Sequence, residues 1–113
     1  MDSLQLNKIE QKPGCIGSAL KIIGDKWTAL ILRDLSTDPH TFSELESALD
    51  GISPRTLSQR LEMLISEKII SKNIYCQHPP RYYYSLTDKG IELQNVLLSM
   101  AEWGAKYHST GCV

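Results

Sequence analysis

The fold is decided by the sequence GISPRTLSQRLEML, which occupies residues 51–64. Ser53 followed by Pro54 predicts a helix start, because a serine hydroxyl accepts a hydrogen bond from a free amide and proline suits the first helical position. The leucines that follow recur at spacings of four and three residues, which places them on one stripe of a helix: Leu57, Leu61 and Leu64. We therefore expect a helix from Pro54 to about Lys68, anchored by this stripe.

The side of this helix opposite the leucines is polar. At 100° per residue, Arg55, Gln59 and Glu62 lie opposite the stripe, and Thr56 flanks them. Side chains in the first two turns of such a helix can reach the edges of DNA bases. An ordinary amphipathic surface helix has the same pattern, so the neighbouring elements must decide between the two interpretations.

The preceding residues predict a second, shorter helix at about 42–49. Thr41 and Glu44 form a capping box, in which each side chain satisfies an amide at the helix start. Only Asp50-Gly51-Ile52 separates this helix from the next, and glycine tolerates the backbone conformation of a tight turn. Two helices joined by a three-residue turn containing glycine are typical of a helix-turn-helix.

The residues that follow change from helical to strand periodicity. Residues 69–76 and 81–86 are rich in β-branched and aromatic side chains, and Gln77-His78-Pro79-Pro80 between them predicts a protruding hairpin tip. A basic hairpin directly after a helix-turn-helix is a wing. The expected fold is therefore mainly α with a small β-hairpin (α+β), a winged helix-turn-helix.

The rest of the chain supplies an arm, three further helices and a tail around this unit. Asp25 and Thr87 are the expected N-caps of two of the helices. The predicted ranges are a polar arm at 1–14, helices at 15–23, 26–35 and 88–107, and a flexible tail at 108–113, so that one domain covers residues 15–107.

Composition favours a DNA-binding protein over an enzyme. The 113 residues carry a net charge of −1, but residues 53–87 hold five basic and two acidic residues (+3), leaving seven basic and eleven acidic residues elsewhere (−4). The affinity of a protein for DNA follows the charge of the local patch that meets it, not the net charge.

No export signal, membrane-length apolar run, phosphate loop or GxSxG or HExxH motif is present, so we expect a cytoplasmic protein that is not an enzyme and does not bind a membrane. The three histidines fall in a turn, the hairpin tip and the tail, where we expect exposure. Three widely spaced cysteines give no disulfide framework or metal site, and no cofactor is predicted.

This geometry assigns individual DNA contacts. Arg55 suits guanine and Gln59 suits adenine. Four residues of the same helix are expected to hold phosphates: Ser53, Thr56, Ser58 and Arg60. Three residues of the hairpin are expected to contact the backbone or an adjacent minor groove: Lys72, His78 and Arg81. The alternative is a winged helix used for protein interaction, whose charged residues are merely solvated.

Several ordered motifs resemble the HxlR-type (DUF24) winged-helix transcriptional regulators. They span about residues 15 to 104: Gly24-Asp25-Lys26-Trp27-Thr28, Phe42-Ser43-Glu44-Leu45, Gly51-Ile52-Ser53, Pro79-Pro80, Tyr84-Ser85-Leu86-Thr87-Asp88-Lys89-Gly90 and Trp103. The resemblance implies a bacterial or archaeal homodimer that binds a double-stranded DNA operator with two-fold symmetry. The chain departs from the common pattern at Ile16, Thr41 and Lys68, where proline, arginine and glycine are usual.

The last helix independently favours the dimer, since its apolar stripe is long for so small a domain. The resemblance places the interface on the N-terminal and last helices. We expect it to contain Ile16, Leu20, Leu93, Val96, Leu97, Met100, Trp103 and Tyr107.

Two cysteines are candidate redox residues. The resemblance implies that Cys15 senses oxidants or electrophiles, and its place at a helix start favours the thiolate. Cys112, in the tail, could supply the resolving thiol of the other subunit. The alternatives are a small apolar residue at Cys15 and an incidental tail cysteine at Cys112.

Overall fold

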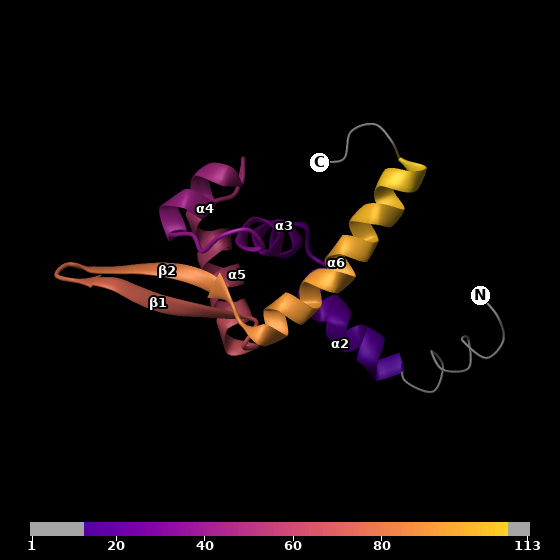
Figure 1. Cartoon of the computed structure of the whole chain (residues 1–113), viewed down its shortest axis with the longest axis horizontal. Helices are drawn as coiled ribbons and strands as arrows, with labels where there is room; N and C mark the ends of the chain where they lie inside the picture. Colours follow the sequence, from indigo (N-terminus) through magenta and orange to yellow (C-terminus); the bar gives the residue numbers. More distant parts are fainter. Residues whose placement is uncertain (1–12, 109–113) are drawn as a thin grey trace.

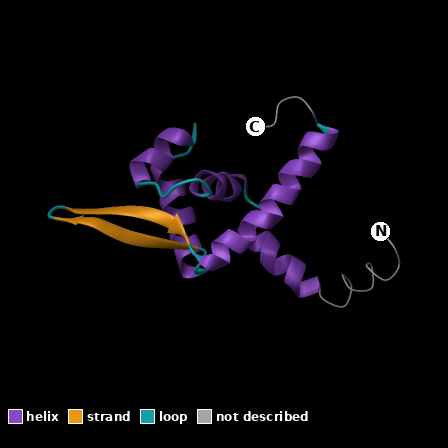
Figure 2. Ribbon diagram, viewed as in Figure 1, coloured by secondary structure: helices purple, strands orange, loops and turns teal. Residues whose placement is uncertain are grey.

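The computed structural model describes residues 13–108 and has the expected winged helix-turn-helix fold (Figures 1 and 2). The elements follow the order helix, helix, helix, helix, hairpin, helix. Their bounds are α2 Pro13–Ile23, α3 Lys26–Leu35, α4 Phe42–Ala48, α5 Pro54–Ser66, β1 Ile70–Gln77, β2 Pro80–Leu86 and α6 Asp88–Tyr107.

Side-chain caps explain where four of these helices begin, as the sequence predicted. Asp25 accepts from the amide of Thr28 at 3.0 Å, and Ser53 accepts from the amide of Thr56 at 3.0 Å. Thr87 caps α6 by accepting from Gly90. At α4 both bonds of the capping box form, with Glu44 N to Thr41 Oγ1 at 3.2 Å and Thr41 N to Glu44 Oε1 at 3.0 Å.

Two helix boundaries differ from those expected. Helix α2 begins at Pro13 rather than Cys15. Helix α5 ends at Ser66 because Lys68 adopts a left-handed conformation, with φ of 62°. The amides of Lys68 and Ile69 then donate back to the carbonyl oxygens of Ile65 and Leu64, both at 2.9 Å. This is a Schellman motif, which normally has glycine at the left-handed position.

The core lies where α3, α4, α5 and the root of the hairpin meet. The leucine stripe of α5 is buried as predicted, and Thr28 is fully buried as well. The buried hydrophobic cluster is formed by Ile31, Leu32, Leu35, Leu45, Leu49, Ile52, Leu57, Leu61, Leu64, Ile69, Ile70 and Tyr84. Helix α3 therefore lies in the middle of the domain, and the leucine stripe of α5 packs into the same buried cluster.

The wing is an antiparallel pair, β1 with β2, in which Lys72 lies opposite Tyr84 and a bulge falls between Ile74 and Cys76. It extends from one end of the molecule in Figure 1. At its root, His40 and Tyr84 form an antiparallel bridge that joins the loop before α4 to β2. The expectation that His40 is exposed was wrong, because its side chain is only 27% exposed.

Helix α6 starts at the root of the wing and runs away from it, and α2 lies toward the end of the molecule opposite the wing (Figure 1). The 20 residues of α6 extend roughly 30 Å, and its C-terminal half projects beyond the rest of the domain. Within residues 13–108, no helix is both long enough and apolar enough to cross a membrane.

Candidate DNA-binding surface

The front of α5 is free to meet a ligand. Arg55, Ser58 and Gln59 are all exposed, while Leu57 between them is fully buried. The leucine stripe thus holds the helix on the core and leaves this edge in solvent. Glu62, one turn further on, is exposed as well and adds a negative charge at the far end of the edge.

Two of the predicted phosphate contacts are engaged with each other. The Ser53 hydroxyl accepts from the amide of Thr56 and donates to the Thr56 hydroxyl, at 3.0 and 2.9 Å. Both side chains therefore build the start of α5. Ser53 remains exposed and Thr56 is half-buried, so the cap itself lies at the surface.

Arg60 has an ionic partner that the sequence analysis missed. Its Nε donates to Asp25 Oδ2 at 2.8 Å, and its Nη2 donates to Oδ1 at 3.4 Å. The bond from Arg60, with those from Thr28, holds the pKa of Asp25 below its ordinary value, and the same pair raises the pKa of Arg60. The two residues are 35 positions apart, so no local pattern could reveal the pair.

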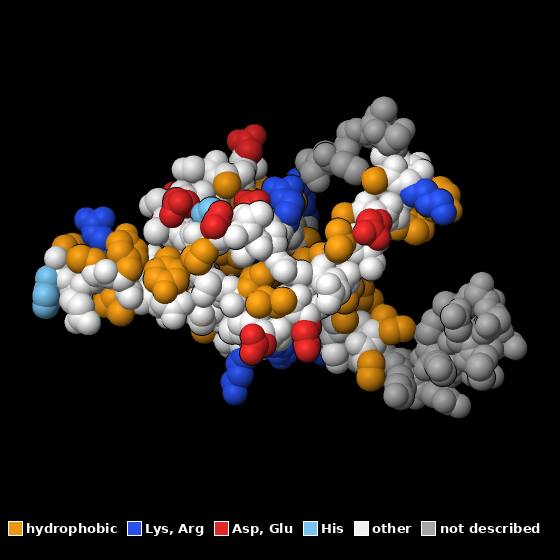
Figure 3. Space-filling model, viewed as in Figure 1, with side chains coloured by type: hydrophobic (Ala, Val, Ile, Leu, Met, Phe, Trp, Pro, Cys, Tyr) orange, Lys and Arg blue, Asp and Glu red, His pale blue; other side chains and the backbone are white. Residues whose placement is uncertain are grey.

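The predicted hairpin contacts lie on the surface of the wing. His78 and Arg81 are exposed at the tip, and the Lys72 ammonium lies 4.4 Å from the centroid of the Tyr82 ring. Such a cation–aromatic contact restrains a lysine side chain while leaving its charge at the surface. In the view of Figure 3, hydrophobic side chains cover much of the visible face of the hairpin.

The predicted dimer residues divide into two groups. Leu93 and Leu97 are partly buried and pack against the domain's own core. The others are exposed: Ile16, Leu20, Val96, Met100, Trp103 and Tyr107, with Trp103 at 62%. The Trp103 and Tyr107 rings contact each other, with centroids 5.2 Å apart. Helices α2 and α6 thus present large apolar side chains that the described part of the chain leaves uncovered.

The two redox candidates differ in what the structure shows of them. Cys15 is exposed in the first turn of α2. Cys112 lies outside the described residues. A third cysteine, Cys76, is half-buried in the wing, and its Sγ lies 3.8 Å from the carbonyl oxygen of His78.

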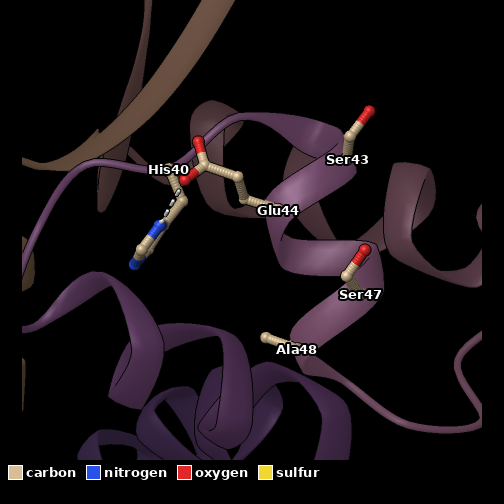
Figure 4. A pocket seen from close by; sticks show the side chains of 5 residues that line it. All are labelled: His40, Ser43, Glu44, Ser47 and Ala48. Atoms are coloured by element: carbon tan, nitrogen blue, oxygen red, sulfur yellow. Dashed lines mark ion pairs between the residues drawn. The ribbon is translucent and has the colours of Figure 1, made fainter.

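The histidines and carboxylates of the described residues were candidates for a metal site or a pocket. Among residues 13–108, no group of three histidine, cysteine, aspartate or glutamate side chains is placed to hold a metal ion. An open depression on α4 is lined by His40, Ser43, Glu44, Ser47 and Ala48 (Figure 4). There the His40 ring lies 3.5 Å from Glu44, and the pKa of Glu44 is lowered by its bonds to Thr41 and His40.

Comparison with known proteins also identifies a helix-turn-helix protein. The profile of the HxlR-like helix-turn-helix family matches residues 22–111. The uncharacterized HTH-type transcriptional regulator YvaP of Bacillus subtilis is 37% identical over 89 residues, which cover 79% of this chain and 82% of YvaP.

Solved structures of transcriptional regulators share the fold. A MarR-family regulator from Enterococcus faecalis is 32% identical, with a TM-score of 0.78 over 87% of this chain and 89% of that one. The oxidized form of the redox regulator HypR is 31% identical, with a TM-score of 0.75 over 80% of this chain and 94% of HypR. With the family profile covering most of the sequence and the winged fold present in full, this chain belongs to the HxlR-like helix-turn-helix family of transcriptional regulators.

Proposed function

We propose that the chain binds a specific DNA operator, with the front of α5 in the major groove and the wing on the adjacent backbone. The observation that carries this proposal is the exposure of Arg55, Ser58 and Gln59 on a helix whose other face is fully buried. In this geometry Arg55 and Gln59 read bases. The exposed wing charges of Lys72 and Arg81 contact phosphates, which supply affinity without sequence preference.

A homodimer joined through α2 and α6 presents two such surfaces to a two-fold operator. The uncovered side chains of Ile16, Leu20, Val96, Met100, Trp103 and Tyr107 support this arrangement, because apolar patches of this kind mark interfaces. The two α5 helices then enter successive major grooves about 34 Å apart. Trp103→Glu tests the dimer by analytical ultracentrifugation. The variant sediments as a monomer if α6 forms the interface, whereas Lys89→Glu, on the same helix near the wing, leaves the sedimentation unchanged.

The DNA-binding proposal is tested by selecting sequences from a random duplex library with the full-length protein. Binding of the selected duplex and of a shuffled duplex is then measured by fluorescence anisotropy across a salt series. We expect a two-fold-symmetric consensus and an affinity that falls steeply as salt rises. Absence of binding at low salt, or an affinity independent of salt, would favour the protein-interaction module instead.

We also propose that oxidation of Cys15 regulates DNA binding. The exposure of Cys15 and the likeness to a redox regulator support this proposal. An oxidant such as diamide removes two electrons and two protons from Cys15 and a second thiol, and the sulfurs join as a disulfide. We assign the second thiol to Cys112 of the partner subunit. Diamide should then produce a dimer band on electrophoresis without reductant, and Cys15→Ser or Cys112→Ser should abolish it.

Both the band and operator binding must change for this regulation to hold. If diamide leaves the monomer band and operator affinity of the wild type unchanged, the disulfide switch is wrong. Mass spectrometry of Cys15 after treatment with a quinone separately tests simple alkylation, which adds the electrophile to the thiolate without a second cysteine.

A further inference from the structure

The short connection between α2 and α3 lies directly against the DNA-reading helix. Gly24 follows α2, and a Cβ at this position would lie 2.5 Å from the carbonyl oxygen of Leu20, so the sharp turn requires glycine. Asp25 comes next and caps α3. The same carboxylate reaches Arg60 in the second turn of α5. One residue thus joins the end of α2, the start of α3 and the body of α5.

The Asp25 carboxylate has a full set of partners. Its Oδ2 accepts from the amide of Thr28, the Thr28 hydroxyl and Arg60 Nε at 3.0, 3.1 and 2.8 Å. Because Thr28 is fully buried, its two hydrogen bonds hold the carboxylate in a fixed position. Because two guanidinium nitrogens meet two carboxylate oxygens, the contact restrains the rotation of the arginine as well as its distance.

The same two parts of the fold also lie close together at Trp27. A Cβ built on Gly51, in the turn between α4 and α5, would lie 3.9 Å from Cη2 of Trp27. Trp27, in the first turn of α3, therefore lies beside the connection before α5, while Asp25 holds α5 itself. Both Asp25 and Trp27 belong to the Gly24-Asp25-Lys26-Trp27 sequence.

We propose that Arg60 is a positioning residue: its ion pair with Asp25 sets the orientation of α5 relative to α2 and α3, and Arg60 does not bind DNA phosphate. This inference rests on the proposed operator binding. It reassigns one of the four helix residues expected to hold phosphates, because the positive charge of this guanidinium is already balanced by a carboxylate and its donors are engaged there. It also makes the α2–α3 connection part of the DNA-reading apparatus.

Asp25→Asn and Arg60→Gln test this role. Asparagine caps helices about as well as aspartate, so Asp25→Asn removes the charge and leaves α3 capped. We expect each variant to bind the selected operator on the order of tenfold more weakly. The shuffled duplex should bind Arg60→Gln and the double variant as it binds the wild type, and the slope of log affinity against log salt should not change in these two variants. The double variant should lose no more operator affinity than whichever single variant binds the operator more weakly.

Arg33→Gln is the matched control. Arg33 is an exposed arginine paired with the adjacent Asp34 at the end of α3, so its removal deletes the same charge away from α5. We expect this control to bind operator and shuffled duplex as the wild type does. Thermal unfolding of each variant, followed by circular dichroism, establishes the temperature range in which it is folded, and binding is measured within that range.

The opposite pattern overturns the inference. If Arg60→Gln lowers the salt slope by about one and weakens both duplexes alike, Arg60 is a phosphate contact. In that case Asp25→Asn, by freeing the arginine, should bind DNA at least as tightly as the wild type. A wild type that binds no selected duplex contradicts the proposed function, whereas a wild type that binds and variants that match it contradict this inference alone.

Discussion

His40 and Tyr84 exchange two backbone hydrogen bonds, with N to O distances of 3.0 and 2.7 Å. The loop before α4 therefore pairs with β2 and ties the wing to the helix-turn-helix. Because Tyr84 is only 7% exposed, its ring anchors this junction in the core. The root of the wing is thus held against the helix-turn-helix.

This relationship predicts a large cost for truncating Tyr84. Tyr84→Ala removes a buried aromatic ring and should lower the free energy of unfolding by about 3 kcal/mol, measured by urea denaturation. Tyr75→Ala is the control, since Tyr75 lies in the same hairpin with 54% exposure. Its cost should stay below about 1 kcal/mol. Equal losses in the two variants would mean that the ring does not anchor the wing.

Lys68 gives the second prediction, a gain in stability. Its φ of 62° is unfavourable for a side chain but not for glycine. Lys68→Gly should therefore raise the free energy of unfolding by about 0.5–1 kcal/mol. Glu67→Gly, at a neighbour with an ordinary helical φ of −82°, should lower it. Urea denaturation of both variants measures the difference, and a loss at Lys68 would show that its side chain matters more than its backbone.

The third prediction contrasts two glycines. A Cβ on Gly90 would collide with the backbone carbonyl oxygen of Ile69, while a Cβ on Gly17 would meet nothing within 4 Å. Gly90→Ala should thus cost about 1–3 kcal/mol, because α6 must move away from the wing. Gly17→Ala should stabilise α2 by about 0.5–1 kcal/mol through better helix propensity. Thermal and urea unfolding measure whether each substitution raises or lowers the free energy of unfolding. A Gly90→Ala variant as stable as the wild type would contradict the close contact.

Acid sensitivity provides the fourth prediction. The Arg60 bond, followed by the Thr28 bonds, holds the pKa of Asp25 below its ordinary 3.8. A lowered carboxyl pKa stabilises the folded state above the unfolded value, and this contribution is lost as the pH falls below 3.8 toward the folded pKa. The stability difference between the wild type and Asp25→Asn should therefore shrink between pH 7 and acidic pH. Glu44, whose pKa is also lowered, remains in both proteins and contributes equally. A difference that does not vary with pH would show that the charge of Asp25 contributes nothing.

Local patterns in the sequence predicted most of the fold. The cap residues and the leucine stripe of α5 act on neighbours a few positions away, so Asp25, Thr41, Ser53 and Thr87 marked their helices correctly. The three leucines of α5 are buried as their spacing required.

What the sequence missed depends on contacts between distant segments. The helical spacing of Arg60 indicated an exposed basic side chain, and only the folded chain brings Asp25, at the start of α3, close enough to pair with it. Leu93 and Leu97 shared a stripe with the exposed α6 residues, but they pack on the domain's own core because the N-terminal half of α6 lies against it. The pairing of His40 with β2 likewise requires the folded chain.

The most direct test of the account is the specificity of Arg55→Ala compared with that of Arg81→Ala. Binding of each variant to the selected operator and to the shuffled duplex is measured by fluorescence anisotropy across the same salt series. We predict that Arg55→Ala loses about 1–3 kcal/mol on the operator and relaxes the sequence preference, whereas Arg81→Ala weakens both duplexes alike and reduces the salt slope. If both variants lose affinity uniformly, α5 does not read the sequence through Arg55.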